Sequence, residues 1–163
     1  MNIAAAIAQH VLEVHHGNNW TDVNIADTLR DVTLAEATAP TPGSPNTIAA
    51  LVRHLAFWNR VMMRRAQGVG TEVDPANGFD GPPLQSAGDW AALQADLMQS
   101  AQELADAIRA VDEAKWSEPI LPNFSTTYKN LQGTVEHVHY HLGQLVILKN
   151  LVRHYHANHQ AST

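Results

Sequence analysis

The sequence predicts an all-α protein: a four-helix bundle with short extra helices and long connecting loops. Apolar residues recur every three to four positions over four long segments, which is the period of an amphipathic helix. No segment shows the alternation of apolar and polar residues that is typical of a strand. With 163 residues, 45% of them hydrophobic, the chain has the size of one globular domain, which we expect over residues 1–163. Four amphipathic helices bury their apolar faces against one another as a bundle.

The first long helix is expected over residues 2–16. Its apolar positions lie at helical spacing and are Ile3, Ile7, Val11 and Val14. Gly17 and the two asparagines after it are a typical helix stop. His15 and His16 fall in the last turn, where a protonated imidazole interacts favourably with the helix dipole. We expect both histidines to have this structural role.

Two short helical pieces are expected next, over residues 24–30 and 34–38, and each begins at a capping signal. Asn24 and Thr33 are residue types that accept a hydrogen bond from the backbone N–H three positions later, and an acidic residue occupies that position in both cases. Residues 40–45 contain three prolines and a glycine, which predicts a loop.

The second long helix is expected over residues 47–67, with Asn46 as its cap and two glycines beyond its end. Its inward face is apolar and consists of Ile48, Leu51, Leu55, Trp58 and Met62. His54 stands beside this face, so its imidazole should point inward or lie at the seam between helices. Residues 69–87 are rich in glycine and proline and predict a long irregular loop, which we expect over one end of the bundle. A loop of this length in a small domain is more often functional than idle.

Two more long helices complete the expected bundle. Ser86 with Asp89 is a capping signal for a helix over residues 88–111. The apolar face of this third helix consists of Trp90, Leu93, Leu97, Leu104, Ile108 and Val111. A connection with two prolines leads to the fourth helix, over residues 129–156. Its inward face consists of Leu131, Thr134, Val138, Leu145, Leu148 and Val152.

Composition excludes several kinds of partner and site. The formal charge is −6, with only ten lysines and arginines, whereas binding to phosphates needs clustered cations. We therefore expect neither a nucleic acid nor a membrane surface as partner. No apolar run has the form of a membrane span or a secretory signal. The absence of cysteine excludes disulfides, thiolate metal ligands and a cysteine nucleophile, and it fits a cytoplasmic protein.

The candidate chemistry lies in the ten histidines. His137 and His141 are four residues apart, a spacing that places two imidazoles on one helix face, where they can hold one metal ion. Both lie on or beside the inward face of their helix, as His54 does on its own helix. Helix bundles build metal sites from side chains on facing helices. Three neutral imidazoles leave open coordination positions for water or substrate, and they favour zinc, nickel or a similar divalent ion.

The expected rotation of this helix also predicts where the neighbours of the histidine pair point. His139 lies roughly 200° round the helix from His137 and from His141, so it should face away from the site. Gln144 lies near the seam, where its side chain could orient an imidazole. Glu136 has a similar position, but for this residue we favour a solvated helix edge.

Structural roles are the alternative for several of these residues. A single histidine at the edge of a core usually just hydrogen-bonds a neighbour, and an i, i+4 pair alone is modest support for a metal site. The convergence of three histidines from two helices favours metal binding over that alternative. Two aromatic neighbours are also given structural roles: Trp58 is expected in the core rather than as a platform for substrate, and Tyr140 is expected to take part in helix packing.

Two segments resemble the signature helices of the DinB/YfiT-like superfamily. The stretch His137-Val-His-Tyr-His141-Leu-Gly-Gln144 resembles the last long helix of that family, where His-x-x-x-His followed by Gly-Gln is usual. The stretch Asn46-Thr-Ile-Ala-Ala-Leu-Val-Arg-His54-Leu-Ala-Phe-Trp58 resembles its second helix, where an Ile-x-x-Leu run precedes a single histidine. The N-terminal part is similar more loosely, so the resemblance covers about residues 10–152.

The resemblance implies an up-down-down-up order of the four helices. It also implies that His54, His137 and His141 bind one divalent metal ion, often nickel or zinc. Relatives in the family are frequently homodimers, and some are metal-dependent thiol transferases or mycothiol-linked isomerases. Candidate contacts for a dimer are apolar residues off the inward face of the second helix, namely Phe57, Val61 and Met63.

We therefore expect a divalent-metal-dependent enzyme of the thiol-transferase or hydrolase kind that acts on a small electrophilic substrate. A low-molecular-weight thiol is a candidate cosubstrate, because the chain has no cysteine of its own. No side chain is assigned as catalytic, since water or a thiol at the metal would be the nucleophile. The alternative is a bundle that binds metal or a ligand without turnover, such as a stress-related binding protein.

Overall fold

The computed structural model describes residues 2–160, together with the side chains of residues 2–155. Within this part the chain is helical and has no strands, so the predicted fold class is confirmed. The elements are α1 (Ile3–His16), α2 (Ile25–Leu29), α3 (Leu34–Thr38), α4 (Ile48–Ala66), α5 (Ala87–Arg109), the 3-10 helix η1 (Glu113–Lys115) and α6 (Thr127–Gln160). None of the helices described is both long and apolar enough to cross a membrane.

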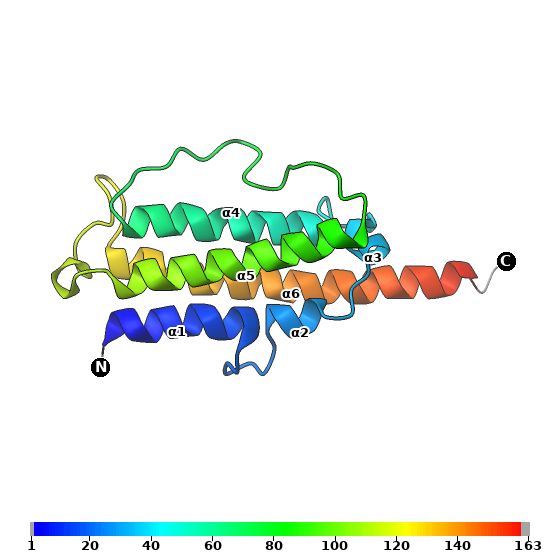
Figure 1. The fold of residues 1–163 in the computed structure, drawn as a ribbon, viewed down its shortest axis with the longest axis horizontal. Helices are drawn as coiled ribbons and strands as arrows, with labels where there is room; N and C mark the ends of the chain where they lie inside the picture. The colour runs from blue at the N-terminus through cyan, green and yellow to red at the C-terminus, as the bar shows by residue number, and fades with distance from the viewer. Residues whose placement is uncertain (1, 161–163) are drawn as a thin grey trace.

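The four long helices α1, α4, α5 and α6 run up, down, down and up. Figure 1 shows α1 and α6 running in one direction and α4 and α5 in the other, which is the order that the resemblance implies. Around the bundle, α4 packs on α5, α5 on α1, α1 on α6, and α6 on α4. The pair that carries the three histidines, α4 and α6, is therefore antiparallel and in direct contact.

The connection between α4 and α5 runs the length of the bundle. Because these two helices are parallel neighbours, the chain has to return from the end of α4 to the level at which α4 began. With its 19 residues α4 is about 28 Å long, and residues 67–86 cover that distance along the outside of the bundle (Figure 1). The expectation that this loop lies over one end is wrong, since a parallel pair needs a connection as long as the helices.

Local signals set where the helices begin. Thr47 caps α4 by accepting a backbone N–H of the first turn, one residue later than the predicted cap, Asn46. The capping signals predicted for α2, α3 and α5 are all formed. The last helix begins at Thr127, two residues before the predicted start, and the Thr126 hydroxyl accepts a backbone N–H of its first turn.

A layer of buried polar side chains divides the core into two apolar clusters. One cluster includes Leu55 of α4 and Val138 of α6. The other includes Met62 of α4 and Val135 of α6. The buried polar residues between them come from all four long helices and are His15, His54, Asn59, Ser100 and His141. Two of the three candidate ligands thus lie where the apolar core is interrupted.

Ion pairs fasten the second half of α6 to the segment around α3. The Lys149 ammonium lies 2.6 Å from Asp31, and the Arg153 guanidinium lies 3.0 Å from Asp31 and 2.8 Å from Glu36. Hydrogen bonds from Lys149 and Arg153 lower the pKa of Asp31 to about 2. These contacts hold the part of α6 that extends past α4 (Figure 1).

Candidate metal centre

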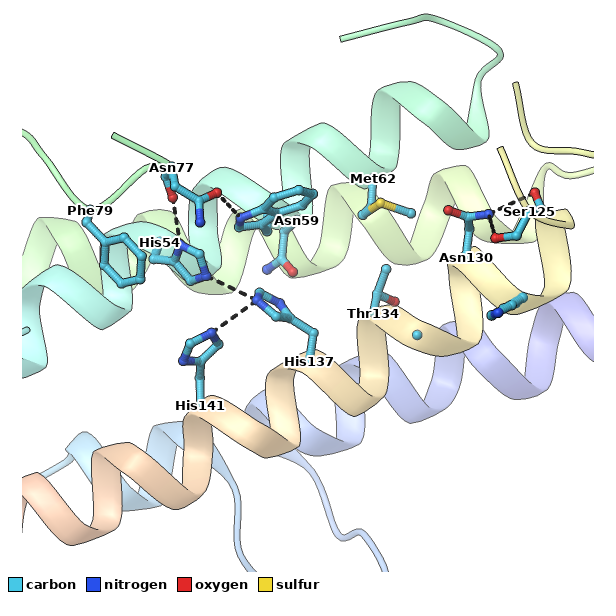
Figure 2. A pocket seen from close by; sticks show the side chains of 13 residues that line it. His54, Asn59, Met62, Asn77, Phe79, Ser125, Asn130, Thr134, His137 and His141 are labelled. Atoms are coloured by element: carbon cyan, nitrogen blue, oxygen red, sulfur yellow. Dashed lines mark hydrogen bonds between the residues drawn. The ribbon is translucent and has the colours of Figure 1, made fainter. Parts of the chain in front are cut away.

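Three imidazoles from facing helices meet at one point. His54 comes from α4, and His137 and His141 come from successive turns of α6 (Figure 2). The Nε2 atom of His137 lies 3.1 Å from Nε2 of His54 and 3.1 Å from Nε2 of His141. One ring nitrogen from each residue lies within 4.8 Å of the other two, so the cluster can hold a metal ion. The structure thereby brings together the three histidines singled out in the sequence.

Hydrogen bonds on the outer side of two rings set their tautomers. The Nδ1 atom of His54 lies 2.6 Å from the carbonyl oxygen of Asn77, and Nδ1 of His141 lies 2.8 Å from Oε1 of Gln144. Both Nδ1 atoms therefore carry the hydrogen, so each neutral ring turns an Nε2 lone pair toward the centre. Gln144 thus orients an imidazole, as expected.

The inner nitrogens are suited to a cation. His137 has at most one hydrogen on Nε2, so it can donate to only one of its two neighbours at 3.1 Å. If Nε2 carries the hydrogen, the second contact has no hydrogen to share, and if it does not, both contacts set lone pairs against each other. A metal ion at the centre removes this repulsion, because the lone pairs become its ligands. Three imidazole donors without thiolate or carboxylate fit zinc, nickel or a similar divalent ion.

The three imidazoles are neutral at pH 7. Burial lowers the pKa of all three from the ordinary value of 6.5. For His137, burial and repulsion from the charged forms of His141 and His54 together lower the pKa to about 4. Neutral imidazole is the form that binds metal, so the cluster is ready to ligate at neutral pH.

The connection between α4 and α5 contributes contacts to His54 that the sequence analysis missed. The Phe79 ring stacks on the imidazole, with ring centroids 4.0 Å apart and an interplanar angle of 10°. Asn77 accepts the Nδ1–H of His54 with its backbone carbonyl, and its side-chain oxygen accepts the indole N–H of Trp58 at 2.9 Å. Together these contacts fix the orientation of the His54 ring.

A glycine lets this connection approach α4. Gly78 has φ 75°, and a Cβ added to it would lie only 2.5 Å from Cβ of Phe57. Asn77 has φ 54°, a left-handed conformation that asparagine adopts more readily than most residues. The Asn-Gly pair is a sequence signal for such a turn, and it could have pointed to this part of the loop.

His15 belongs to the polar layer and is not a charged helix end. Its side chain is 0% exposed, and its Nδ1–H donates to the Val11 carbonyl at 2.7 Å. Its Nε2 accepts from the amide nitrogen of Asn59 at 3.1 Å, and the same nitrogen donates to the Ser100 hydroxyl at 3.0 Å. Burial lowers the pKa of His15 to about 4. The expected imidazolium is therefore wrong for His15, because helix packing covers this face of the last turn, whereas His16 stays exposed.

A pocket of about 470 Å³ extends from the histidines along the seam between α4 and α6 (Figure 2). Its wall on α4 includes Trp58 and Met62, and Gly133 leaves the wall on α6 without a side chain. Trp58, expected in the core, packs against an apolar cluster and also lines this pocket. Both amide hydrogens of Asn59 are used in the polar layer, so its Oδ1 atom is left to face the pocket. The volume is that of a small-molecule site.

The predicted positions of other residues near the cluster are confirmed in two cases and wrong in one. His139 faces away, as predicted: its Nδ1 lies 3.1 Å from the Val135 carbonyl, and its ring lies beside His10 of α1. Glu136 is on an exposed helix edge, the role favoured for it. Tyr140 is 65% exposed, so the expected part in helix packing is wrong. Tyr140 lies on the side of α6 that faces neither α1 nor α4.

Fold and site together define a helical bundle with a three-histidine cluster that can bind a metal ion. The sequence matches the family model of the DinB superfamily over residues 19–145. The chain therefore belongs to the DinB superfamily, whose members are metal-binding proteins. Searches of curated proteins and of solved structures gave no match.

Proposed function

We propose that this protein is a divalent-metal-dependent enzyme that transfers a thiol to a small electrophilic substrate, with zinc or nickel held by His54, His137 and His141. One observation carries the proposal: the three inner nitrogens converge at the wall of a pocket large enough for a small molecule. A structural metal site is usually closed by four protein ligands, whereas three candidate ligands lie here among the described residues. Three ligands leave room for an exchangeable one.

The proposed chemistry divides between the ion and the chain. A bound divalent ion supplies a Lewis acid that lowers the pKa of a thiol or a water molecule. The thiol arrives as a cosubstrate, because the chain has no cysteine. Its sulfur forms a bond to the electrophilic carbon, the leaving group departs with its bonding electrons, and the thiol proton passes to water. Trp58 and Met62 offer an apolar wall to the electrophile, and Asn59 offers a hydrogen-bond acceptor.

Hydrolysis is the second form of the same proposal, with water in place of the thiol. A non-catalytic binding protein is the alternative function, and one observation favours it. Among the described residues that line the pocket there is no carboxylate, so no general base stands beside the cluster. A thiol that the metal has acidified loses its proton without such a base, so thiol transfer does not need one. For this reason we favour transfer over hydrolysis.

One set of assays separates these functions. The protein is purified without a tag, its metal content is measured, and low-molecular-weight thiols are offered with a chlorodinitrobenzene or an alkyl halide, with and without chelator. Consumption of thiol that depends on the metal and is lost in His141→Ala, but kept in His139→Ala, supports transfer. Cleavage of esters or amides without thiol supports hydrolysis. Neither activity across a broad panel supports the binding protein.

We also propose a homodimer, as the resemblance implies. Of the predicted contacts, Phe57 and Met63 are half-buried and remain candidates, whereas Val61 is 2% exposed and packs inside its own bundle. Tyr140 and Ile147, 65% and 60% exposed, offer a second apolar face on α6. A monomer in light scattering at micromolar concentration would remove the dimer proposal. A cytoplasmic location is part of the same proposal, since small thiols are kept reduced there.

A further inference from the structure

The pocket has a cationic end that the proposed chemistry does not use. Lys129 is the one Lys, Arg, Asp or Glu among the described residues that line the pocket. Its side chain is exposed, and no carboxylate described in the structure lies within salt-bridge distance of it. Since Lys129, Gly133, His137 and His141 follow one another at intervals of four residues, they lie along one side of α6. The ammonium group and the histidines thus belong to the same wall.

A second unpaired cation stands near this end. The guanidinium carbon of Arg65 lies 5.5 Å from the ring centre of Trp58, which lines the pocket, and 4.8 Å from that of Phe124. Its Nε atom is buried without a hydrogen-bond partner, and no described carboxylate pairs with the group. Arginine remains charged at neutral pH even when partly buried. The group as a whole is half-buried, and a half-buried cation without a counter-charge favours an anion beside it.

The antiparallel register places both cations at one level. Arg65 lies eleven residues beyond His54 on α4, and Lys129 lies eight residues before His137 on α6. At about 1.5 Å per residue, the two cations are roughly 12 to 16 Å from the histidines along the helices. Lys129 and Asn130 also lie in the first turn of α6, where the helix dipole favours negative charge. Most of the rest of the protein repels anions, since its net charge is −6.

We propose that the pocket selects an elongated ligand with a carboxylate at the end remote from its reacting group. Lys129 and Arg65 hold the carboxylate, the apolar middle of the ligand lies along Trp58 and Met62 past Gly133, and the reacting group lies at the histidines. This inference rests on the proposed function, because it names the class of substrate for that site. The carboxylate subsite itself uses none of the candidate metal ligands.

Two thiols of equal length test the inference. Calorimetry at low salt compares ω-mercaptooctanoate with ω-mercaptooctanol on the zinc-loaded protein. We expect the carboxylate to bind roughly fivefold more tightly or better, and this preference to shrink at high salt. Lys129→Gln and Arg65→Gln should each bring the two affinities close together with zinc content unchanged. Arg64→Gln is the matched control: it removes the same charge from the neighbouring exposed residue, which lines a different cavity, and it should keep the preference. Arg65, by contrast, lies against Trp58 and Met62 of this pocket.

The outcomes separate this inference from the proposed function. The carboxylate subsite would be overturned if the parent protein bound both thiols equally or bound neither. It would also be overturned if Arg64→Gln lost the preference as fully as Lys129→Gln and Arg65→Gln do. Thiol transfer without a preference would leave the proposed function in place and remove only the subsite. The comparison is then repeated after chelation. A preference that persists there and still depends on Lys129 supports the subsite, even where the transfer assay has failed.

Discussion

The backbone carbonyl of Asn77 accepts a hydrogen bond from Nδ1 of His54 at 2.6 Å, across 23 positions of the chain. Phe79, two residues further on, stacks on the same imidazole. One candidate ligand is thus oriented by the connection between α4 and α5, whereas His141 is oriented by Gln144 of its own helix. Metal affinity should therefore depend on how this connection docks.

Gly78→Ala should weaken metal binding about 10- to 100-fold, because the connection could no longer hold Asn77 against His54. The added Cβ would lie 2.5 Å from Phe57 and force the loop away from α4. Competition with a chromophoric chelator measures the effect. Gly68→Ala is the matched control: it has a similar φ of 79° but open space around the added Cβ. Equal affinities in the two variants would refute the role of the docked loop.

Replacement of any one of His54, His137 and His141 by alanine should remove most of the bound metal, because two imidazoles hold a divalent ion much less tightly than three. His139→Ala should keep it, since that ring lies beside His10 on the other side of α6. Elemental analysis of the untagged proteins gives the answer. Metal loss in His139→Ala together with retention in His141→Ala would contradict the site.

Gly133→Leu should block the pocket without disturbing the metal, because its side chain would enter the space that glycine leaves open. We expect zinc content to be unchanged and the affinity for ω-mercaptooctanoate to fall at least tenfold. Gly143→Leu is the control: it lies in the same helix, has equally open surroundings and does not line the pocket. Both variants should gain about 0.5 to 1 kcal/mol in stability, since glycine is a poor helix former. Equal thiol affinity in the two would show that the ligand does not pass Gly133.

The stability of the metal-free protein should fall in acid, and His15 should contribute to this together with the three histidines of the cluster. Folding lowers the pKa of the buried His15 imidazole from 6.5 to about 4, so the unfolded chain takes up the proton first. The contribution of His15 is complete above about pH 6.5, declines as the pH falls toward 4, and amounts to about 3 kcal/mol. Urea unfolding across this range measures it.

The matched variants for this test are His15→Gln and His16→Gln. The first keeps a polar side chain in the layer with Asn59 and removes the titrating ring, so the free energy of unfolding should vary less steeply with pH. The second changes the exposed neighbour and should leave the pH dependence as in the parent. The same slope in all three proteins would mean that His15 makes no such contribution.

Much of the bundle and the cluster could be predicted because both depend on helical spacing. Apolar period located the four long helices, and the four-residue spacing of His137 and His141 put both on one face. The contacts of Asn77 and Phe79 could not be found this way. They depend on the path of a connection without regular structure, and that path follows from the parallel arrangement of α4 and α5, about which periodicity says nothing.

Two errors have a common physical origin. The dipole argument for His15 assumed an exposed helix end, whereas packing of α1 against α5 and α6 turns this ring toward the centre of the bundle, where it meets Asn59 of α4. Val61 was placed off the inward face of α4, but this helix contacts both α5 and α6, so its buried face is wider than one apolar stripe. In a four-helix bundle each helix has two neighbours, which widens the buried face beyond what spacing alone predicts.

Because the connection between α4 and α5 docks on His54, metal binding and the docking of this segment should each favour the other. Whatever factor the docked segment adds to the affinity for metal, the metal adds to the population of the docked segment. Residues 67–86 are exposed over much of their length and have few apolar anchors, so such segments open at low free-energy cost. A bound ion would thus stabilise the docked conformation of a segment that belongs to no helix. Removing the ion would loosen one wall of the pocket while the four helices stayed in place.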